Sequence, residues 1–292
     1  MKKYIYLIVL VVAIALSLCY ILKSADLPEY NLSKPDEVIK LPKTLKEISG
    51  ITVTSENQIA CVEDEIGTVF IYDISTDRMV NEYENNLTGD FEGIALVGTT
   101  MYVLRSDGML VEYTDYTSPA SETIEYDLNL PSINNEGLCY DKKNNRLLIA
   151  AKSKTEDNIE KKSIRLIYGF DLKTKKVYGE PILKLHIKHI QSKALELNLP
   201  KTKIGKHKED EFNFRPSEIA VNPIDSCIYI LSGKDKLLLV TNVKGEIKNL
   251  MALEEKLFKQ AEGITFLSNG DMLISNEGQK GKPTLLLFKY KH

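Results

Sequence analysis

The chain has 292 residues and a formal net charge of −3, from 38 basic and 41 acidic residues. This near balance gives no general basic field, which excludes recognition of nucleic acid through a positively charged surface. The length could hold two domains, but the repeats described below predict one closed unit over residues 26–292, preceded by an N-terminal segment at residues 1–25.

The N-terminal segment has the character of a membrane anchor. Residues 4–22 carry no charge and follow Lys2 and Lys3. As a helix they would measure roughly 28 Å, close to the hydrocarbon thickness of a bilayer. We predict an uncleaved transmembrane helix, while a lipoprotein attached through Cys19 and a cleaved secretory signal remain open alternatives. The two lysines favour an N-terminus inside the cell, so we expect a cell-membrane protein, single-pass or lipid-anchored, with its folded part on the extracytoplasmic side.

A short phrase recurs five times, at spacings of 43, 44, 82 and 44 residues. The copies are Ser49-Gly50-Ile51, Glu92-Gly93-Ile94, Glu136-Gly137-Leu138, Glu218-Ile219-Ala220 and Glu262-Gly263-Ile264. Each opens a series of short runs rich in Val, Ile, Leu and Tyr that are bounded by Gly, Asn and Asp, which is typical of strands. Periods of about 40 to 50 residues are typical of propeller blades. The sequence therefore predicts an all-β fold, a five-bladed β-propeller of four-stranded antiparallel sheets.

The expected strands follow in chain order. They are 51–54, 58–62, 68–73 and 78–83 in the first copy, 93–97, 101–104, 109–113 and 122–128 in the second, and 137–140, 146–151, 164–171 and 177–185 in the third. Residues 186–198 have a helical pattern and, with the polar run that follows, form a helical insertion at about 186–211. Six blades remain possible if this insertion contains an irregular one.

The fourth copy covers about 218–253, and the fifth shows three strands before the sequence ends. Residues 37–41 are expected to supply the missing outer strand of the fifth copy. The two ends of the chain would then close the ring and remove exposed sheet edges.

The first strand of each blade lies beside the central channel, so equivalent residues form a ring around the axis. The predicted ring consists of Ser49, Glu92, Glu136, Glu218 and Glu262. Because strand side chains alternate with a period of two, the same face carries oxygen-bearing residues one layer away, including Glu47, Asp90 and Asn134. In the other direction the equivalent residues are apolar and are expected to pack between blades.

The extended phrases resemble the SdiA-regulated family of bacterial membrane-associated β-propellers. They are Glu47-Ile48-Ser49-Gly50-Ile51, Asp90-Phe91-Glu92-Gly93-Ile94-Ala95, Asn134-Asn135-Glu136-Gly137-Leu138, Arg215-Pro216-Ser217-Glu218-Ile219-Ala220 and Gln260-Ala261-Glu262-Gly263-Ile264. The resemblance extends from about residue 41 to 290. It implies a propeller fold and a membrane location, and it implies no particular reaction.

Four glutamates around one axis repel each other, because like charges a few ångströms apart raise one another's pKa. Either cations or protons must compensate them. All-oxygen ligands without His or Cys favour calcium, so we predict a Ca²⁺ site formed by ring residues and their neighbours: Ser49, Glu92, Glu136, Glu218, Glu262, Glu47, Asp90 and Asn134. The alternative is that each glutamate caps backbone N–H groups or pairs with a basic side chain, without a metal.

Basic side chains at or just after the ends of the second strands should reach the same opening as the ring. Arg105, Lys152 and Lys234 are candidates to hold a phosphate or carboxylate group of a ligand, since such cations bind these anions by charge-assisted hydrogen bonds. The alternative is that they pair with the ring glutamates.

These observations favour an extracytoplasmic, calcium-binding propeller that serves as a ligand-binding or interaction module for a small-molecule or protein ligand. The alternative is a calcium-dependent hydrolase of phosphoesters or related esters, which would rest on analogy of fold. The chain contains no G-x-S-x-G, P-loop or H-E-x-x-H motif, which argues against the corresponding hydrolase, nucleotide-binding and zinc-protease mechanisms.

Overall fold

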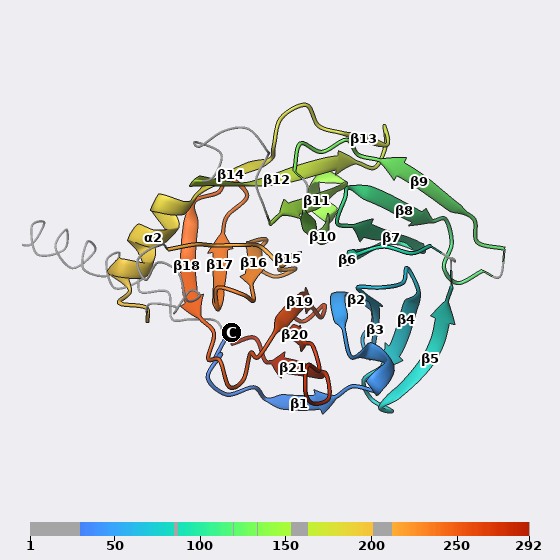
Figure 1. Cartoon of the computed structure of the whole chain (residues 1–292), viewed down its shortest axis with the longest axis horizontal. Helices are drawn as coiled ribbons and strands as arrows, with labels where there is room; N and C mark the ends of the chain where they lie inside the picture. Colours follow the sequence, from blue (N-terminus) through green and yellow to red (C-terminus); the bar gives the residue numbers. More distant parts are fainter. Residues whose placement is uncertain are drawn as a thin grey trace, which may run out of the picture.

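The computed structural model describes residues 30–84, 87–118, 120–132, 134–152, 163–200 and 212–291. Strands of the described residues form five sheets around a central axis (Figure 1). This arrangement confirms the predicted five-bladed, all-β propeller. The described part of the insertion contributes the α-helix α2 (Ile187–Glu196) beside blade 4, not a sixth sheet (Figure 1).

Three blades are simple four-stranded antiparallel meanders, with the first strand nearest the axis and the fourth outermost. Blade 1 contains β2 (Ile48–Ser55), β3 (Gln58–Glu63), β4 (Val69–Asp73) and β5 (Arg78–Tyr83). Blade 2 contains β6 (Phe91–Val97), β7 (Thr100–Arg105), β8 (Met109–Tyr113) and β9 (Thr123–Asp127). Blade 4 contains β15 (Glu218–Val221), β16 (Ile228–Ser232), β17 (Leu237–Thr241) and β18 (Ile247–Ala252).

Blade 3 departs from the expected pattern at its outer edge. It contains β10 (Asn135–Asp141), β11 (Arg146–Ala151), β12 (Ile164–Asp171), β13 (Lys176–Val177) and β14 (Leu183–His186). The single outer strand expected at 177–185 is divided, because β13 and β14 pair with opposite ends of the long strand β12.

Blade 5 closes the ring with strands from both ends of the described chain. β19 (Ala261–Phe266), β20 (Met272–Asn276) and β21 (Thr284–Phe288) are joined by β1 (Glu37–Lys40). β1 pairs antiparallel with β21, from Glu37 opposite Leu287 to Lys40 opposite Thr284 (Figure 1). The predicted closure by residues 37–41 is therefore confirmed. The 3₁₀ turn η1 (Lys43–Leu45) connects β1 to blade 1, and η2 (Lys142–Asn144) connects β10 to β11.

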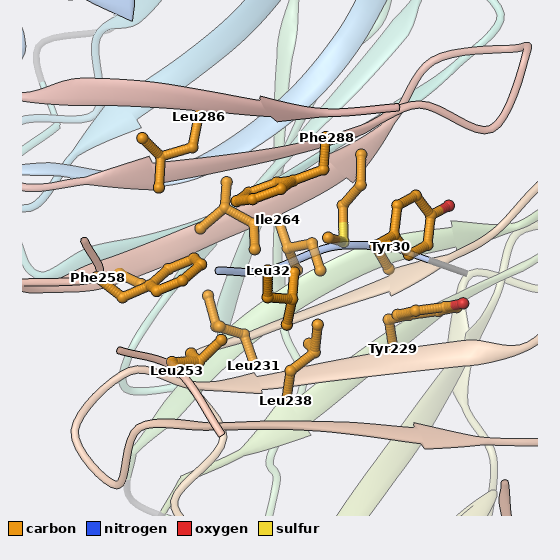
Figure 2. Packing of buried hydrophobic residues seen from close by; sticks show 14 of the residues in the cluster. Tyr30, Leu32, Tyr229, Leu231, Leu238, Leu253, Phe258, Ile264, Leu286 and Phe288 are labelled. Atoms are coloured by element: carbon orange, nitrogen blue, oxygen red, sulfur yellow. The ribbon is translucent and has the colours of Figure 1, made fainter. Parts of the chain in front are cut away.

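The core consists of apolar clusters, most of which join neighbouring blades. The cluster joining blades 4 and 5 includes Tyr30 and Leu32, which precede β1 and lie between side chains of both sheets (Figure 2). Burial of such large side chains stabilises the fold by about 2 kcal/mol each. Blade-to-blade packing is therefore tightened by residues at the beginning of the described chain.

No helix of the described residues is both long and apolar enough to cross a membrane. The expected anchor at residues 4–22 lies outside the described part of the chain, as do Cys19 and residues 201–211 of the insertion.

Candidate carboxylate ring at the propeller axis

The inner strands begin at one end of the axis, which we call the mouth; the other end is called the rear face. Second strands end at the mouth. Asp64 N donates to Glu47 O (3.3 Å), Ser106 N to Asp90 O (2.8 Å) and Lys152 N to Asn134 O (3.0 Å). The predicted residues before the ring and those after the second strands thus meet at one opening.

Three ring glutamates lie at β-bulges. The pairing of inner and second strands skips one residue between Phe91 and Gly93, between Asn135 and Gly137, and between Ala261 and Gly263. The skipped residues are Glu92, Glu136 and Glu262. A bulge leaves its extra residue outside the ladder and redirects the side chain. The strict two-residue alternation used to predict a second polar layer is therefore interrupted at these positions.

Glycines next to the ring allow inner strands of adjacent blades to touch through their backbones. A Cβ on Gly50 would lie 2.8 Å from Glu92 O, one on Gly93 would lie 2.8 Å from Glu136 O, and one on Gly137 would lie 2.8 Å from Ile219 N. Any side chain there would clash with backbone atoms, which explains the glycine in four of the five phrases. Ser49 is buried, and its carbonyl oxygen would lie 2.8 Å from a Cβ placed on Gly263, so blades 5 and 1 make the same close contact and the ring is closed.

Glu136 and Glu218 are the most buried ring glutamates, with 1% and 0% of their surface exposed. Glu218 Oε1 accepts hydrogen bonds from Leu138 N of the neighbouring blade (2.7 Å) and from Ile219 N (3.0 Å). Glu136 Oε2 accepts one from Lys152 Nζ (2.6 Å). Glu136 Oε1 and Glu218 Oε2 have no hydrogen-bond partner among the described residues. Each carboxylate is therefore half satisfied by protein.

The pKa of each of the four ring glutamates is raised. Burial, followed by repulsion from Glu136, raises the pKa of Glu92 to about 9. Burial raises the pKa of Glu262 to about 8, although Lys152 opposes this change. Burial likewise raises the pKa of Glu136, against the attraction of Lys152, and that of Glu218, against its two backbone hydrogen bonds. The charge of several carboxylates on one axis is therefore incompletely compensated by the chain.

The three predicted ligand-binding cations differ in their surroundings. Lys152 enters the ring, where the charges of Glu136, Glu262 and Glu92 raise its pKa although its burial opposes this. Arg105 forms two hydrogen bonds with Asp107, at 3.0 and 2.7 Å. Lys234 is exposed. Only Lys152 among these three contacts a ring glutamate in the described structure.

A second acidic group lies at the mouth of blade 1. Carboxylate oxygens of Glu47, Glu63 and Asp64 lie within 4.8 Å of one another. Burial, followed by repulsion from its acidic neighbours, raises the pKa of Asp64. Glu277 of blade 5 continues this arc, and its pKa is raised to about 7 mainly by burial. Glu63, Asp64 and Glu277 were absent from the predicted metal set, although the run of three acidic residues at 63–65 beside Glu47 was a usable signal.

Lys236 is a further cation near the ring that the sequence did not single out. Its Nζ donates to the carbonyl oxygens of Phe258 and Lys259, both at 2.8 Å, and burial lowers its pKa although Glu262 opposes this. Because it is held by backbone carbonyls, Lys236 compensates the ring only at a distance.

The apolar layer behind the ring lines a small cavity of about 100 Å³ at the centre of the five inner strands. Its lining includes Ile51, Ile94, Leu138, Ala220 and Ile264. These residues also belong to the clusters between blades, as predicted. Thr52, Tyr140 and Thr265 line the same cavity, so the axis behind the ring has a mixed, uncharged lining, and the carboxylates are confined to the mouth.

Comparisons with known proteins agree with this architecture. The SdiA-regulated family model matches residues 23–280, and no curated protein matches the chain. Among solved structures, the chain is similar to glutaminyl cyclase from Myxococcus xanthus, with a TM-score of 0.57 and 13% identity over 88% of this chain and 95% of that chain. It is also similar to a chain of a nidogen/laminin complex, with a TM-score of 0.50 and 11% identity over 81% and 78% of the two chains. At such identities the likeness shows the fold alone.

Proposed function

The chain belongs to the SdiA-regulated family, and we propose that it is a membrane-anchored, extracytoplasmic binding module that holds a Ca²⁺ ion in its carboxylate ring. The observation that carries the metal site is the pair of buried oxygens without a protein partner, Glu136 Oε1 and Glu218 Oε2. A buried carboxylate oxygen without a partner is costly, and a cation between these groups would remove that cost.

The donor types suit calcium, although among the described residues the three carboxylates whose oxygens lie within 4.8 Å of one another are Glu47, Glu63 and Asp64, not ring members. Glu92, Glu136, Glu218 and Glu262 are the residues that would hold the ion, and all offer carboxylate oxygen, the ligand that Ca²⁺ prefers. Lys152 contributes one positive charge to this group of four carboxyls. A divalent cation would supply the missing charge and lower the pKa of each carboxyl that it contacts.

The anchor is supported by sequence: residues 4–22 are uncharged and follow two lysines, a pattern that favours a span with its N-terminus inside. No observation favours the phosphoester hydrolase over the binding module. Two of its three expected phosphate-binding cations, Arg105 and Lys152, are engaged by Asp107 and Glu136.

The test combines metal analysis with melting of the purified full chain. We expect calcium to co-purify and to raise the melting temperature over a sample treated with chelator. A calcium concentration about 100-fold above the Kd contributes about 2.7 kcal/mol, or about 5 °C for a domain of this size.

The variant for this test is Glu136→Gln with Glu218→Gln, which keeps the shape and the existing hydrogen-bond acceptors. It should lose the calcium response. The matched control is Glu180→Gln with Glu246→Gln at two exposed positions, which should keep the response. Equal calcium shifts in both double variants, or no shift in the unmodified chain, would contradict a calcium site in the ring.

A further inference from the structure

The chain enters the propeller at its rear face, where Tyr30 is fixed between blades 4 and 5. Tyr30 is 1% exposed and contacts Tyr229 and Tyr290, with ring centroids 6.0 and 5.7 Å away. Its hydroxyl donates to Gly270 O (2.5 Å) and accepts from Asn222 Nδ2 (2.7 Å). Gly270 lies in the turn between β19 and β20, and Asn222 follows β15, so both lie where inner strands end. Figure 2 shows Tyr30 and Leu32 within this cluster.

From this point β1 runs toward the mouth, since Glu37 pairs near the end of β21 and Lys40 pairs at its beginning. The described chain therefore begins, at Tyr30, on the face opposite the carboxylate ring. Seven residues, 23–29, separate the uncharged segment from Tyr30. Such a length reaches at most about 25 Å when fully extended, which keeps the rear face close to any membrane that holds residues 4–22.

The rear face carries exposed lysines on blades 3, 4 and 5. We call six of them the basic sector: Lys34, Lys142, Lys143, Lys244, Lys289 and Lys291. They lie beside the chain entry or in the turns that follow inner and third strands. Blades 1 and 2 differ, because residues 47–141 contain no lysine and only one exposed arginine at the rear among the described residues, Arg78 at the start of β5. The lysines of the rear face are therefore concentrated on blades 3 to 5, around and beside the place where the described chain begins.

Apolar side chains are exposed within the same sector. Ile224, in the turn between β15 and β16, is 47% exposed, and Val243, in the turn between β17 and β18, is 42% exposed. A pocket of about 450 Å³ between blades 3 and 4 is lined by Lys142, Lys143 and Val243, among others. Exposed apolar tips flanked by lysines fit the interface of a bilayer with anionic headgroups.

We propose that the basic sector docks on the anionic phospholipid headgroups of the membrane that anchors the chain, with Ile224 and Val243 in the headgroup layer and the carboxylate mouth facing away from the bilayer. This inference rests on the proposed membrane anchor and is independent of calcium. The short tether and the place where the described chain begins specify the rear face. Exposed lysines also lie at the mouth, so the tether selects the face and the lysines of the basic sector supply the attraction, while the mouth remains open to a ligand from the aqueous side.

The experiment uses the full chain reconstituted in vesicles and follows amide hydrogen exchange. Vesicles of phosphatidylcholine alone are compared with vesicles of phosphatidylcholine and phosphatidylserine. We expect residues 222–226 and 242–246 to exchange about tenfold more slowly in the anionic vesicles, because each lysine near the surface adds attraction. Residues 278–283, at the mouth, should exchange equally in both.

Two variants, each with four Lys→Glu substitutions, test whether the protection depends on the rear lysines. Lys142→Glu, Lys143→Glu, Lys289→Glu and Lys291→Glu together should abolish the protection. Lys43→Glu, Lys256→Glu, Lys280→Glu and Lys282→Glu change the same charge at exposed mouth positions and should preserve it. The protection of the rear turns in the anionic vesicles should also decrease at high salt, because salt screens the attraction between the lysines and the headgroups. Melting of both variants in detergent controls for folding.

The outcomes separate the two proposals. Equal exchange of the rear turns in both vesicle types, or protection of the mouth turns, would overturn the docking surface while leaving the anchor intact. If the unmodified chain does not float with phosphatidylcholine vesicles, the anchor of the proposed function is wrong. In that case, flotation with the vesicles that contain phosphatidylserine tests the docking surface by itself. If the unmodified chain and the mouth variant float with these vesicles and the rear variant does not, the docking surface is supported. If the unmodified chain does not float with them, the docking surface is refuted.

Discussion

Replacing Glu92 by glutamine should stabilise the calcium-free protein, and the gain should increase with pH. Burial and repulsion from Glu136 raise the pKa of Glu92 from 4.5 to about 9. The folded chain therefore retains a proton that the unfolded chain releases. A carboxyl whose pKa is raised by folding contributes stability that is fully present below pH 4.5 and is lost as the pH rises toward 9. Glutamine preserves the shape and does not titrate.

The magnitude follows from the width of this window. Each pH unit inside it is worth about 1.4 kcal/mol, so the interval from pH 5 to pH 7 gives an upper limit of about 3 kcal/mol. Glu92 keeps some exposure to water, and halving the effect for solvent screening gives about 1.5 kcal/mol. Urea unfolding in the presence of chelator, at pH 5 and pH 7, measures this difference directly.

The matched control is Glu125→Gln on β9, where the side chain is exposed. It should show no comparable gain. A stability difference between Glu92→Gln and the unmodified chain that is the same at both pH values would refute the argument that Glu92 is desolvated and repelled in the ring. Saturating calcium should reverse the sign, because the unmodified chain then gains a stabilisation that the variant has partly lost.

Other substitutions test the packing and pairing around the axis. Lys152→Met should destabilise the protein by about 3 kcal/mol in urea unfolding, because it leaves buried Glu136 without its cation, whereas Lys234→Met at an exposed position should be nearly neutral. Gly93→Ala should lower the melting temperature, because its Cβ would lie 2.8 Å from a backbone oxygen of the next blade. We expect the free energy of unfolding to decrease by about 2 kcal/mol. Gly179→Ala has open space around the new Cβ and should leave the melting temperature unchanged. Tyr30→Phe should cost about 1 to 3 kcal/mol by calorimetry, because a buried amide and a carbonyl lose their partner.

The repeat predicted the blades well because its signal is periodic and local. Five phrases at nearly constant spacing specify five inner strands, and a glycine after the ring residue predicts close backbone contact, which the structure shows at Gly50, Gly93 and Gly137. The closure by β1 was predictable because blade 5 lacked an outer strand. The divided outer edge of blade 3 was also foreshadowed, because Gly179 and Pro181 lie between β13 and β14; the prediction of one strand over 177–185 gave these strand breakers too little weight.

The details of the site were less predictable, because they depend on irregular geometry and on distant pairs. A β-bulge leaves no clear mark in a single sequence, so the alternation assumed around Glu92, Glu136 and Glu262 was too regular. The pairing of Arg105 with Asp107 is local and was available from the sequence. The position of Tyr30 depends on contacts 192 and 240 residues away and required the closed ring.

The shortage of positive charge beside the ring glutamates follows from how the ring is built. Glycines bring adjacent inner strands into backbone contact, which leaves no room beside the glutamates for long basic side chains from those strands. Cations can therefore arrive only from second strands and later positions, and among the described residues Lys152 forms a direct ion pair with a ring glutamate. Among the described residues no basic side chain lines the cavity behind the ring, so protons or a cation from solution must supply the rest. A fold selected for stability alone would replace such carboxylates with apolar groups, and their presence in four of five blades is what favours a binding role for the mouth.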